Sequence, residues 1–295
     1  MDWNCRKNTE VQILSFKDKV FLITGGAGSL GRRLTETLIS PFYEVSKVRV
    51  LDTNENGLAM MRRQVPDPEK KLRFLLGDIC DKERIRRAMD QVDIVIACAA
   101  QKHIDLAEYN PFFCVLVNVV GTQNCIEAAL DANVERFLYL SSDKAVQATS
   151  TYGRCKALAE SLTIDAANYK GDKRTVFSIA RPPNFTNSDG SVFEVWKYQK
   201  EHNLPLTVTN ENMVRYFMKF EDVISFVINC IVFMKGKEIF IPLKSEKKRI
   251  IDLAREMSEN IKIVGLRPGE KLEELLIDPS EMERAEEVDG MLVIK

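Results

Sequence analysis

The sequence predicts an α/β protein in which helices cover both faces of a mainly parallel sheet. Two patterns support this prediction: short runs that are apolar throughout, and segments between them in which apolar residues recur with helical spacing. Runs of the first kind are typical of parallel strands that are buried on both faces. Regular alternation of such strands with helices favours a doubly wound sheet.

The predicted strands are the apolar runs at 19–24, 47–52, 72–78, 92–100, 135–142 and 175–182. The helices predicted between them lie at 29–39, 55–64, 82–90, 110–133 and 150–169. Beyond residue 182 the pattern changes to short strands mixed with helices. There the strands are expected at 204–209, 238–243 and 262–266, and the helices at 221–234, 249–259 and 270–277. This change predicts a smaller C-terminal α/β lobe that is interleaved with the main sheet.

Composition limits the possible partners of the chain. Its 295 residues are 45% hydrophobic, and the formal net charge is -1. No block of basic residues indicates a nucleic-acid partner. The uninterrupted apolar runs fall well short of the roughly 18 residues that a membrane span needs, and residues 1–19 contain no apolar signal core. We therefore expect no contact with a membrane.

The cysteines indicate a reducing compartment and no metal. The chain has 7 cysteines and 2 histidines, and no two cysteines form a CxxC pair. This spacing does not fit a zinc site, so we expect no bound metal. Several cysteines lie inside apolar runs, where a reduced thiol behaves as a small buried hydrophobe. We therefore expect a cytoplasmic protein.

A glycine-rich stretch, TGGAGSLG at 24–31, follows the first predicted strand and opens the first predicted helix. Gly25, Gly28 and Gly31 have the spacing GxxGxxG. In this position glycines let the backbone turn tightly and approach a pyrophosphate, which the N–H groups at the helix N-terminus then bind. We expect a dinucleotide here, with Ser29 and Leu30 among its contacts. The alternative is an ordinary glycine-rich turn between a strand and a helix.

Asp52, at the end of the second predicted strand, indicates which dinucleotide binds. A carboxylate at this point accepts hydrogen bonds from both adenosine ribose hydroxyls and repels a 2′-phosphate. No arginine follows at 53–55, so NAD is favoured over NADP. Asp78 and Ile79, after the third strand, are expected at the adenine. A solvated carboxylate at a strand end is the alternative for Asp52.

These features divide the chain into two parts. We expect an NAD-binding Rossmann-type domain over 1–182, with 1–16 as an N-terminal extension. Residues 183–295 are expected to form mainly the substrate-binding lobe.

Residues 141–156 combine acidic, basic and phenolic side chains in one short segment. Asp143 and Lys144 directly follow a predicted strand, and Tyr152 and Lys156 have the spacing YxxxK on a predicted helix. Positions i and i+4 share a helix face, so the Lys156 ammonium can lower the pKa of the Tyr152 phenol and hold the nicotinamide ribose. A tyrosinate can then take the proton of a substrate alcohol. A chance YxxxK and a solvated turn after the strand are the alternatives.

The motifs and their order resemble the extended short-chain dehydrogenase/reductase superfamily. Within it, the chain is similar to the UDP-N-acetylglucosamine 4,6-dehydratases of the polysaccharide-biosynthesis group. Members of that group carry a Ser/Thr-Asp-Lys triplet followed by YGxxK, which corresponds here to residues 142–144 and 152–156. The resemblance runs nearly end to end. It includes the segments at 99–112, 118–130, 190–199, 213–227 and 265–277.

The resemblance implies a chemistry for each catalytic residue. Tyr152 and NAD would oxidise carbon 4 of the sugar, and Ser142 would hydrogen-bond the 4-oxygen. Lys144 would remove the proton on carbon 5, which the new ketone makes acidic. Asp143 would protonate the departing 6-hydroxyl, and hydride would return to carbon 6. Simple epimerases need no such acid–base pair.

The resemblance also implies binding residues for the cofactor and the substrate. Ala99 and Ala100 would contact the cofactor, and Lys102 would lie near both cofactor and substrate. Asn118, on the next helix, would orient groups near Tyr152. The residues expected to bind the UDP-sugar are Arg215 and Arg267 at the diphosphate, and Asn184 and Glu270 at the nucleotide or the sugar. An ordinary polar role on a helix or loop is the alternative for each.

One segment departs from the family pattern. At 180–191 the chain reads ARPPNFTNSDGS, so Pro182 and Pro183 replace the usual tyrosine and glycine. Two prolines remove two N–H donors and stiffen the backbone near the sugar. The resemblance implies UDP-N-acetylglucosamine as the substrate. The change near the sugar leaves the exact sugar open. A UDP-hexose 4-epimerase and a non-catalytic NAD-binding regulatory protein are the alternative functions.

The helices expected at 111–132 and 152–169 carry more apolar residues than one face of a sheet should cover. In the superfamily that the chain resembles, the equivalent helices of two subunits pack together in dimers. We therefore expect a homodimer or a higher homo-oligomer.

Overall fold

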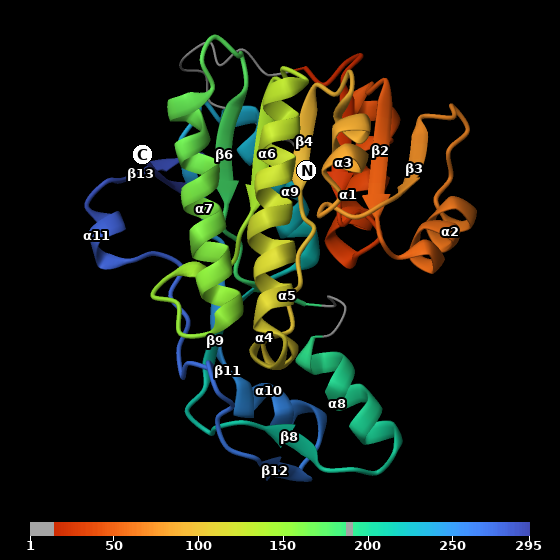
Figure 1. The fold of residues 1–295 in the computed structure, drawn as a ribbon. Coiled ribbons are helices and arrows are strands. Elements are labelled where there is room, and N and C mark those ends of the chain that lie inside the picture. Colours follow the sequence, from red (N-terminus) through yellow and green to blue (C-terminus); the bar gives the residue numbers. More distant parts are fainter. Residues whose placement is uncertain (1–14, 187–190) are drawn as a thin grey trace, which may run out of the picture.

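The computed structural model describes residues 15–186 and 191–295, and at its centre lies a nine-stranded sheet (Figure 1). The strand order is β13-β14-β10-β6-β5-β4-β1-β2-β3. Neighbouring strands from β3 to β10 are parallel, whereas β14 pairs antiparallel with both β10 and β13. The order reverses between β1 and β4, and ligands of such sheets bind beside the carboxyl ends of the strands at this point.

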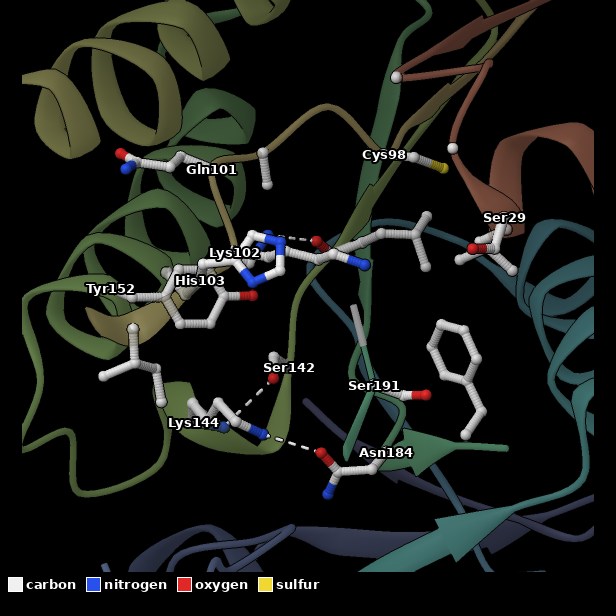
Figure 2. Close-up of a pocket in the computed structure, with 18 of the residues that line it drawn as sticks. Ser29, Cys98, Gln101, Lys102, His103, Ser142, Lys144, Tyr152, Asn184 and Ser191 are labelled. Carbon is white, nitrogen blue, oxygen red and sulfur yellow. Dashed lines mark hydrogen bonds between the residues drawn. The ribbon is translucent and has the colours of Figure 1, made fainter. Parts of the chain in front are cut away.

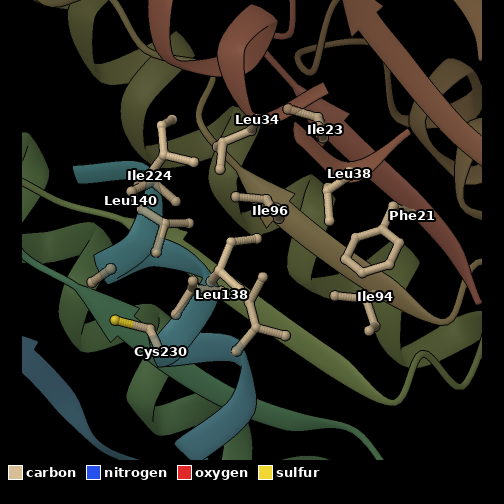
Figure 3. Close-up of a cluster of buried hydrophobic side chains, with 14 of the residues drawn as sticks. Phe21, Ile23, Leu34, Leu38, Ile94, Ile96, Leu138, Leu140, Ile224 and Cys230 are labelled. Atoms are coloured by element: carbon tan, nitrogen blue, oxygen red, sulfur yellow. The ribbon is translucent and has the colours of Figure 1, made fainter. Parts of the chain in front are cut away.

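The strands predicted before residue 182 are all present, which confirms the α/β fold. The strands of the main sheet are β1 Val20–Thr24, β2 Lys47–Asp52, β3 Leu72–Leu76, β4 Ile94–Ala97, β5 Arg136–Leu140, β6 Val176–Ala180, β10 Ile239–Pro242, β13 Ala285–Val288 and β14 Met291–Ile294. Their side chains alternate between two apolar cores. Phe21 and Ile23 enter one core, which Figure 3 shows, and Leu22 enters the other. Burial on both faces explains why the central strands β1, β4, β5 and β6 are almost entirely apolar, whereas the edge strand β13 contains two glutamates.

Helices cover each face of the main sheet. The core on the first face includes side chains from α1 Ser29–Leu38, α2 Glu55–Gln64 and α9 Phe220–Phe233. The core on the second face includes side chains from α3 Lys82–Met89, α6 Thr122–Asp131 and α7 Thr151–Tyr169. The catalytic helix predicted at 150–169 is therefore α7, and it packs beside β6.

A helical stretch at 104–131 carries an irregular turn. It consists of α4 Ile104–Tyr109, α5 Pro111–Val115, the π-helical η2 Leu116–Gly121, and α6. Residues Pro111–Asp131 form one helical segment that is long and apolar enough, by length and composition alone, to cross a membrane. Polar residues such as Asn118 and Thr122 interrupt it, so it contains no uninterrupted apolar run of that length. Half of its most apolar window is buried inside the molecule, as in the core helix of a globular protein.

Two small sheets form a lobe below the main sheet (Figure 1). Their strands and the neighbouring helices are β7 Asn184–Phe185, α8 Val192–Glu201, β8 Leu206–Val208, β9 Val214–Met218, β11 Glu246–Arg249, α10 Ile250–Met257 and β12 Ile261–Ile263. This lobe has its own core around Trp196. The same C-terminal part of the chain also supplies β10, β13 and β14 to the main sheet, so the two are interleaved. The assignment of residues 183–295 mainly to substrate binding stays a prediction.

The predicted helix at 270–277 is wrong, because this segment is irregular or extended. Its carbonyl groups bond elsewhere: Leu272 O accepts from Val214 N at 2.8 Å, and Lys271 O accepts from the Arg215 guanidinium at 2.8 Å. A helix would need these carbonyls for its own bonds. The helices not predicted from the sequence are α4, α8, η1 Pro41–Tyr43, η3 Asp143–Ala145 and α11 Pro279–Met282. Most of the expected N-terminal extension, and residues 187–190 of the turn before α8, lie outside the described residues.

Candidate active site

A cavity of about 840 Å³ lies between the carboxyl ends of the main-sheet strands and the small lobe. This volume is near the upper end of the roughly 300–1,000 Å³ that is typical of ligand cavities, as a cofactor site and a substrate site in one cavity require. The cavity brings together all of the catalytic, cofactor and substrate residues expected from the sequence: Gly25, Gly28, Ser29, Leu30, Gly31, Asp52, Asp78, Ile79, Ala99, Ala100, Lys102, Ser142, Asp143, Lys144, Tyr152, Lys156, Asn184, Arg215, Arg267 and Glu270. Asn118 is not among the lining residues.

The glycine-rich turn requires glycine for steric reasons at two positions. Gly25 has a φ of +63°, and a Cβ added to it would lie 2.7 Å from the Ala99 backbone. A Cβ on Gly31 would lie 2.6 Å from Gly26 Cα, so Gly31 lets α1 pack against the turn. The N-terminus of α1 thus faces the cavity, with its N–H groups placed for an anion such as a pyrophosphate.

Asp52 is held in place at the end of β2. Its Oδ2 accepts from Ala27 N at 2.9 Å, and its Oδ1 accepts from Asn54 N at 2.8 Å. A carboxylate offers about four acceptor sites, so both oxygens retain capacity for ribose hydroxyls. In the connection between β3 and α3, Asp78 Oδ1 accepts a hydrogen bond from Cys80 N at 2.8 Å. The part of the cavity that is expected to receive the adenosine therefore carries two oriented carboxylates.

The segment after β5 carries Asp143 and Lys144, which are expected to act as acid and base. Ser142 caps η3, and the next residue, Asp143, is 1% exposed. Lys144 Nζ lies 2.9 Å from Asp143 Oδ1, which makes the two an ion pair with the ammonium partly open to the cavity. The Asn184 side chain bridges them: it accepts from Lys144 Nζ at 3.1 Å and donates to Asp143 Oδ2 at 3.2 Å. Figure 2 shows Lys144, Asn184 and Ser142 converging below Tyr152.

Tyr152 is buried, and its pKa is raised above the usual value of a phenol. Burial is the largest cause, the negative charge of Asp143 adds to it, and a hydrogen bond with Ser142 acts in the opposite direction. The expected lowering of this pKa by Lys156 is therefore not met in the structure. A buried phenol beside a carboxylate favours its neutral form.

Lys156 stands one helical turn along α7, as the YxxxK spacing predicts. Its Nζ donates to Leu140 O and lies 4.2 Å from the centre of the Tyr139 ring. Burial lowers the pKa of Lys156 to about 8, and Glu160 partly opposes this shift. Its ammonium is thus fixed against the end of β5, beside the cavity.

The segment at 269–278 is hydrogen-bonded to the loop between Lys144 and α7. Thr149 Oγ1 donates to Gly269 O at 2.8 Å, and Lys271 Nζ donates to Val146 O at 2.8 Å. Gln147 Nε2 also donates to Asp278 Oδ2 at 2.9 Å. These bonds connect the loop between Lys144 and α7 to residues 269–278. The segment at 269–278 therefore helps to position the loop that follows Lys144.

The structure refines three other expected roles. Asn118, buried in η2, exchanges two hydrogen bonds of 2.9 Å with the Gln101 backbone, so it orients the loop after β4 and not Tyr152 itself. Arg215 is buried and donates to the carbonyl groups of Val214, Leu272 and Lys271. Part of its guanidinium therefore serves the fold. Arg267 is exposed, and its backbone N–H donates to Glu270 Oε2 at 3.0 Å.

Several lining residues were missed by the sequence reasoning. Gln101 Oε1 and Ser191 Oγ are buried in the cavity wall without a hydrogen-bond partner among the described residues, so a ligand can supply one. His103 also lines the cavity. Gln101 and His103 lie in the loop after β4, and Ser191 directly precedes α8. Loops at such positions often carry binding residues, so this position in the sequence could have identified them. In the described part of the chain, no group of acidic, histidine or cysteine side chains could hold a metal ion.

The chain is similar to proteins of nucleotide-sugar metabolism. A family model described as "Polysaccharide biosynthesis protein" matches residues 21–295. An uncharacterised membrane protein of Methanocaldococcus jannaschii is 41% identical over 95% of this chain and 86% of its own length. A UDP-N-acetylglucosamine 4,6-dehydratase (inverting) of Campylobacter jejuni is 36% identical over 95% of this chain and 83% of its own. A UDP-glucose 4-epimerase of Rickettsia felis is 31% identical over 93% and 82%.

Solved structures show the same fold. The X-ray structure of Pen from Bacillus thuringiensis matches with a TM-score of 0.91 at 35% identity, covering 95% of this chain and 89% of that chain. The dTDP-glucose 4,6-dehydratase DesIV from Streptomyces venezuelae, solved with NAD bound, matches with a TM-score of 0.77 at 23% identity, covering 90% of both chains.

Proposed function

Because the chain belongs to the polysaccharide biosynthesis protein family, whose members include nucleotide-sugar enzymes, we propose that it catalyses the NAD-dependent 4,6-dehydration of UDP-N-acetylglucosamine. One observation carries this proposal. A buried carboxylate and a cavity-facing amine, Asp143 and Lys144, lie 2.9 Å apart in the same cavity as Tyr152 and Lys156. Oxidation of a sugar alcohol needs only the tyrosine and lysine, whereas removal of water also needs an acid and a base.

The residues of the site divide the reaction between them. Bound NAD supplies the capacity to accept hydride from carbon 4 and to return it at carbon 6. Tyr152 takes the proton of the 4-hydroxyl, and Ser142 forms a hydrogen bond with the 4-oxygen. Lys144 removes the proton of carbon 5, which lies α to the new carbonyl, and Asp143 protonates the 6-oxygen as it leaves as water. Asn184 keeps the acid and the base oriented toward the same sugar.

The cofactor site fits NAD through the glycine turn and the carboxylate of Asp52. Asp52→Ala should weaken NAD binding and narrow the difference between NAD and NADP, because it removes acceptors for the ribose and the charge that repels a 2′-phosphate. Calorimetric titration of both dinucleotides measures this. Asp67→Ala is the matched control, since that carboxylate accepts from Lys71 N and Leu72 N near the start of β3 and lies outside the cavity. Tighter binding of NADP to the unmodified protein would contradict the assignment.

A UDP-hexose 4-epimerase is the second candidate, because the Rickettsia relative carries that name. Incubation with UDP-N-acetylglucosamine and NAD, followed by mass spectrometry, separates the candidates. Dehydration lowers the product mass by one water, and epimerisation leaves the mass unchanged but changes the sugar in its NMR spectrum. A non-catalytic NAD-binding protein would bind the dinucleotide and change neither. Parallel incubations with UDP-glucose test which sugar is accepted.

We also propose that the chain forms a dimer through an apolar surface on α4, α5, η2 and α7. The exposed side chains of this surface are Leu106, Tyr109, Phe112, Val115, Val120 and Leu158. They lie on adjacent helices, and contiguous apolar surface of this kind marks an interaction site. A second copy of the chain can cover it with the same surface, as two-fold symmetry requires.

The dimer should dissociate when charge enters this surface. Phe112 is 79% exposed, and Phe112→Glu would bury a carboxylate at the contact, so light scattering should show a monomer where the unmodified protein shows a dimer. Phe42→Glu is the control, because Phe42 is 85% exposed on η1, outside this surface. A monomeric unmodified protein at micromolar concentration would count against the proposal.

A cytoplasmic location is consistent with these features, and we propose it. The six cysteines in the described part of the chain are all free, which is typical of a reducing compartment. The apolar stretch Pro111–Asp131 is accounted for by its packing in the fold and by the proposed dimer contact. It therefore requires no membrane.

A further inference from the structure

A buried arginine directly follows β6 and is not among the residues that line the cavity. Arg181 is 2% exposed, and its guanidinium lies between the carboxylates of Glu160 and Glu281. Its Nε and Nη2 donate to Glu160 at 3.0 and 2.7 Å, and its Nη1 and Nη2 donate to Glu281 at 2.8 and 2.9 Å. Its Nη1 also donates to Leu276 O at 3.2 Å. These five bonds use all five N–H groups of a guanidinium, so no donor is left for a substrate or a cofactor.

The two carboxylates connect the guanidinium to both ends of a closed path of hydrogen bonds. Glu160 lies on α7, the helix of the YxxxK motif. Glu281 lies on α11, and its Oε2 accepts from Asp278 N at 2.8 Å in the cap of that helix. Asp278 Oδ2 in turn accepts from Gln147 Nε2 at 2.9 Å. Gln147 belongs to the loop that leads into α7, so the path returns to the helix on which it began.

Along the chain, Arg181 also leads to the side chain that bridges the expected acid and base. Pro182 and Pro183 follow it, and both are buried. A proline ring restricts its own φ to about −65°, so this segment has little rotational freedom. The next residue is Asn184, whose side chain bonds to both members of the pair (Figure 2). A displacement of Arg181 is therefore passed on to Asn184.

We propose that Arg181 is a positioning residue for the loss of water, an inference that rests on the proposed dehydration. Asp143 and Lys144 lie between two supports that the arginine holds. One support is Asn184, and the other is the loop that contains Gln147. The arginine itself touches neither substrate nor cofactor, and it acts by keeping the acid and the base in place at the sugar. A displacement of about 1 Å at reacting groups can lower a rate about 10²-fold.

The groups expected to oxidise carbon 4 have supports of their own. Tyr152 packs in an apolar cluster with Cys114 and Cys155, and the Glu108 carboxylate on α4 accepts from Thr151 N at the start of α7. The glycine turn for the dinucleotide follows β1, which β4 and β5 separate from β6 in the sheet. Disruption of the arginine's bonds should therefore slow the loss of water more than the oxidation of carbon 4.

Substitution of the arginine tests the two steps separately. Arg181→Lys keeps the positive charge but lacks the planar fork of N–H groups that binds two carboxylates. In the full-length protein loaded with NAD, loss of water from UDP-N-acetylglucosamine should be about 10²-fold slower. Reduced nicotinamide should form at the rate of the wild type and accumulate, and NAD should bind with unchanged affinity. Arg174→Lys is the matched control, because Arg174 also pairs with two carboxylates, those of Asp93 and Glu135, outside the cavity.

A second set of variants breaks and restores the path at an exposed position, where the fold is not at risk. Gln147→Glu has nearly the same shape but places a carboxylate against Asp278, so the link is lost. Gln147→Lys replaces the hydrogen bond by an ion pair and should retain the rate of the wild type. Gln147→Glu should slow the loss of water, and its effect should be smaller in the Arg181→Lys background, since both changes break the same path.

Hydrogen exchange tests the positioning without turnover. Ala145 N and Val146 N donate to carbonyl groups of the preceding turn at 3.0 and 3.2 Å, so their exchange with heavy water reports how firmly that turn is held. Mass spectrometry of peptides from 142–150 should show faster exchange in Arg181→Lys and in Gln147→Glu. The wild type, Gln147→Lys and the Arg174 control should exchange at one common, slower rate.

The outcomes separate the positioning role from the proposed function. Equal slowing of oxidation and of loss of water in Arg181→Lys would make the arginine a structural cross-link only and overturn the proposal. Normal loss of water with unchanged exchange would overturn it as well. If Arg181→Lys does not fold, the two Gln147 variants decide by the same measurements. If the wild type removes no water, the dehydration proposal fails, and exchange at 142–150 then decides by itself whether Arg181 holds this turn in place.

Discussion

Tyr152→Phe should stop the reaction before carbon 4 is oxidised, because it removes the group that accepts the proton of the 4-hydroxyl. Loss of a general base lowers a rate by about 10²–10⁴-fold. Only the phenolic oxygen is lost, and the ring stays in the small apolar cluster that it shares with Cys114 and Cys155. The fold and the binding of NAD should therefore be preserved.

Absorbance of the reduced nicotinamide, recorded after mixing the NAD-loaded protein with UDP-N-acetylglucosamine, checks this expectation. The wild type should show a transient signal and the Tyr152→Phe variant none. Tyr198→Phe is the control, since Tyr198 is 57% exposed on α8 and lies outside the cavity. A transient of normal size in Tyr152→Phe would show that another group takes the proton.

Replacement of the acid or the base should block a later step. Asp143→Asn keeps the shape of the side chain but provides no acidic proton, and Lys144→Arg keeps a positive charge but provides no amine that can act as a base. Each variant should still oxidise carbon 4 and should lose water about 10²–10⁴-fold more slowly. Reduced nicotinamide should therefore accumulate under substrate in both, in contrast to the Tyr152 variant.

Exchange at carbon 5 distinguishes the acid from the base. In heavy water, Asp143→Asn should still incorporate deuterium at carbon 5, whereas Lys144→Arg should not, and mass spectrometry of the recovered sugar measures this. Lys144→Arg is preferred to an apolar substitution, because removing one partner of a buried ion pair costs about 3–5 kcal/mol. Lys244→Arg is the matched surface control, since its side chain is 77% exposed. Near-normal loss of water in both variants would show that Asp143 and Lys144 only form a turn after β5 and take no part in the reaction.

The parts of the protein that the sequence predicted correctly are those that local patterns control. The apolar runs that became β1, β4, β5 and β6 are almost wholly buried, so their composition alone identified them. The glycine turn was equally clear, because Gly25 and Gly31 occupy positions that admit no side chain. Asp143, Lys144 and the YxxxK motif were also visible as short motifs after a strand or on a helix, and all of them line the cavity. Their acid–base roles stay a prediction.

The errors have a common cause. The segment at 270–277 has helical spacing, but Val214 and Arg215, far from it in the sequence, bind its carbonyl groups. The strands β13 and β14 were not predicted, because they pair with a sheet edge formed by distant residues. Contacts between distant parts of the chain outweigh weak local preferences, and the sequence does not display those contacts.

By itself, the sequence determined the α/β fold and the glycine turn for a dinucleotide, and it supplied the residues that are proposed to carry the chemistry. Only the tertiary structure decided how these residues act on one another. It placed Asn184 between Asp143 and Lys144, and it put the Asp143 charge close enough to raise the pKa of Tyr152. It also directed the Ser142 proton toward Asp143. Residue types and spacing set which protons can move, but the free energy of each charged form depends on burial and on distances of a few ångströms, which arise only when separate segments pack together.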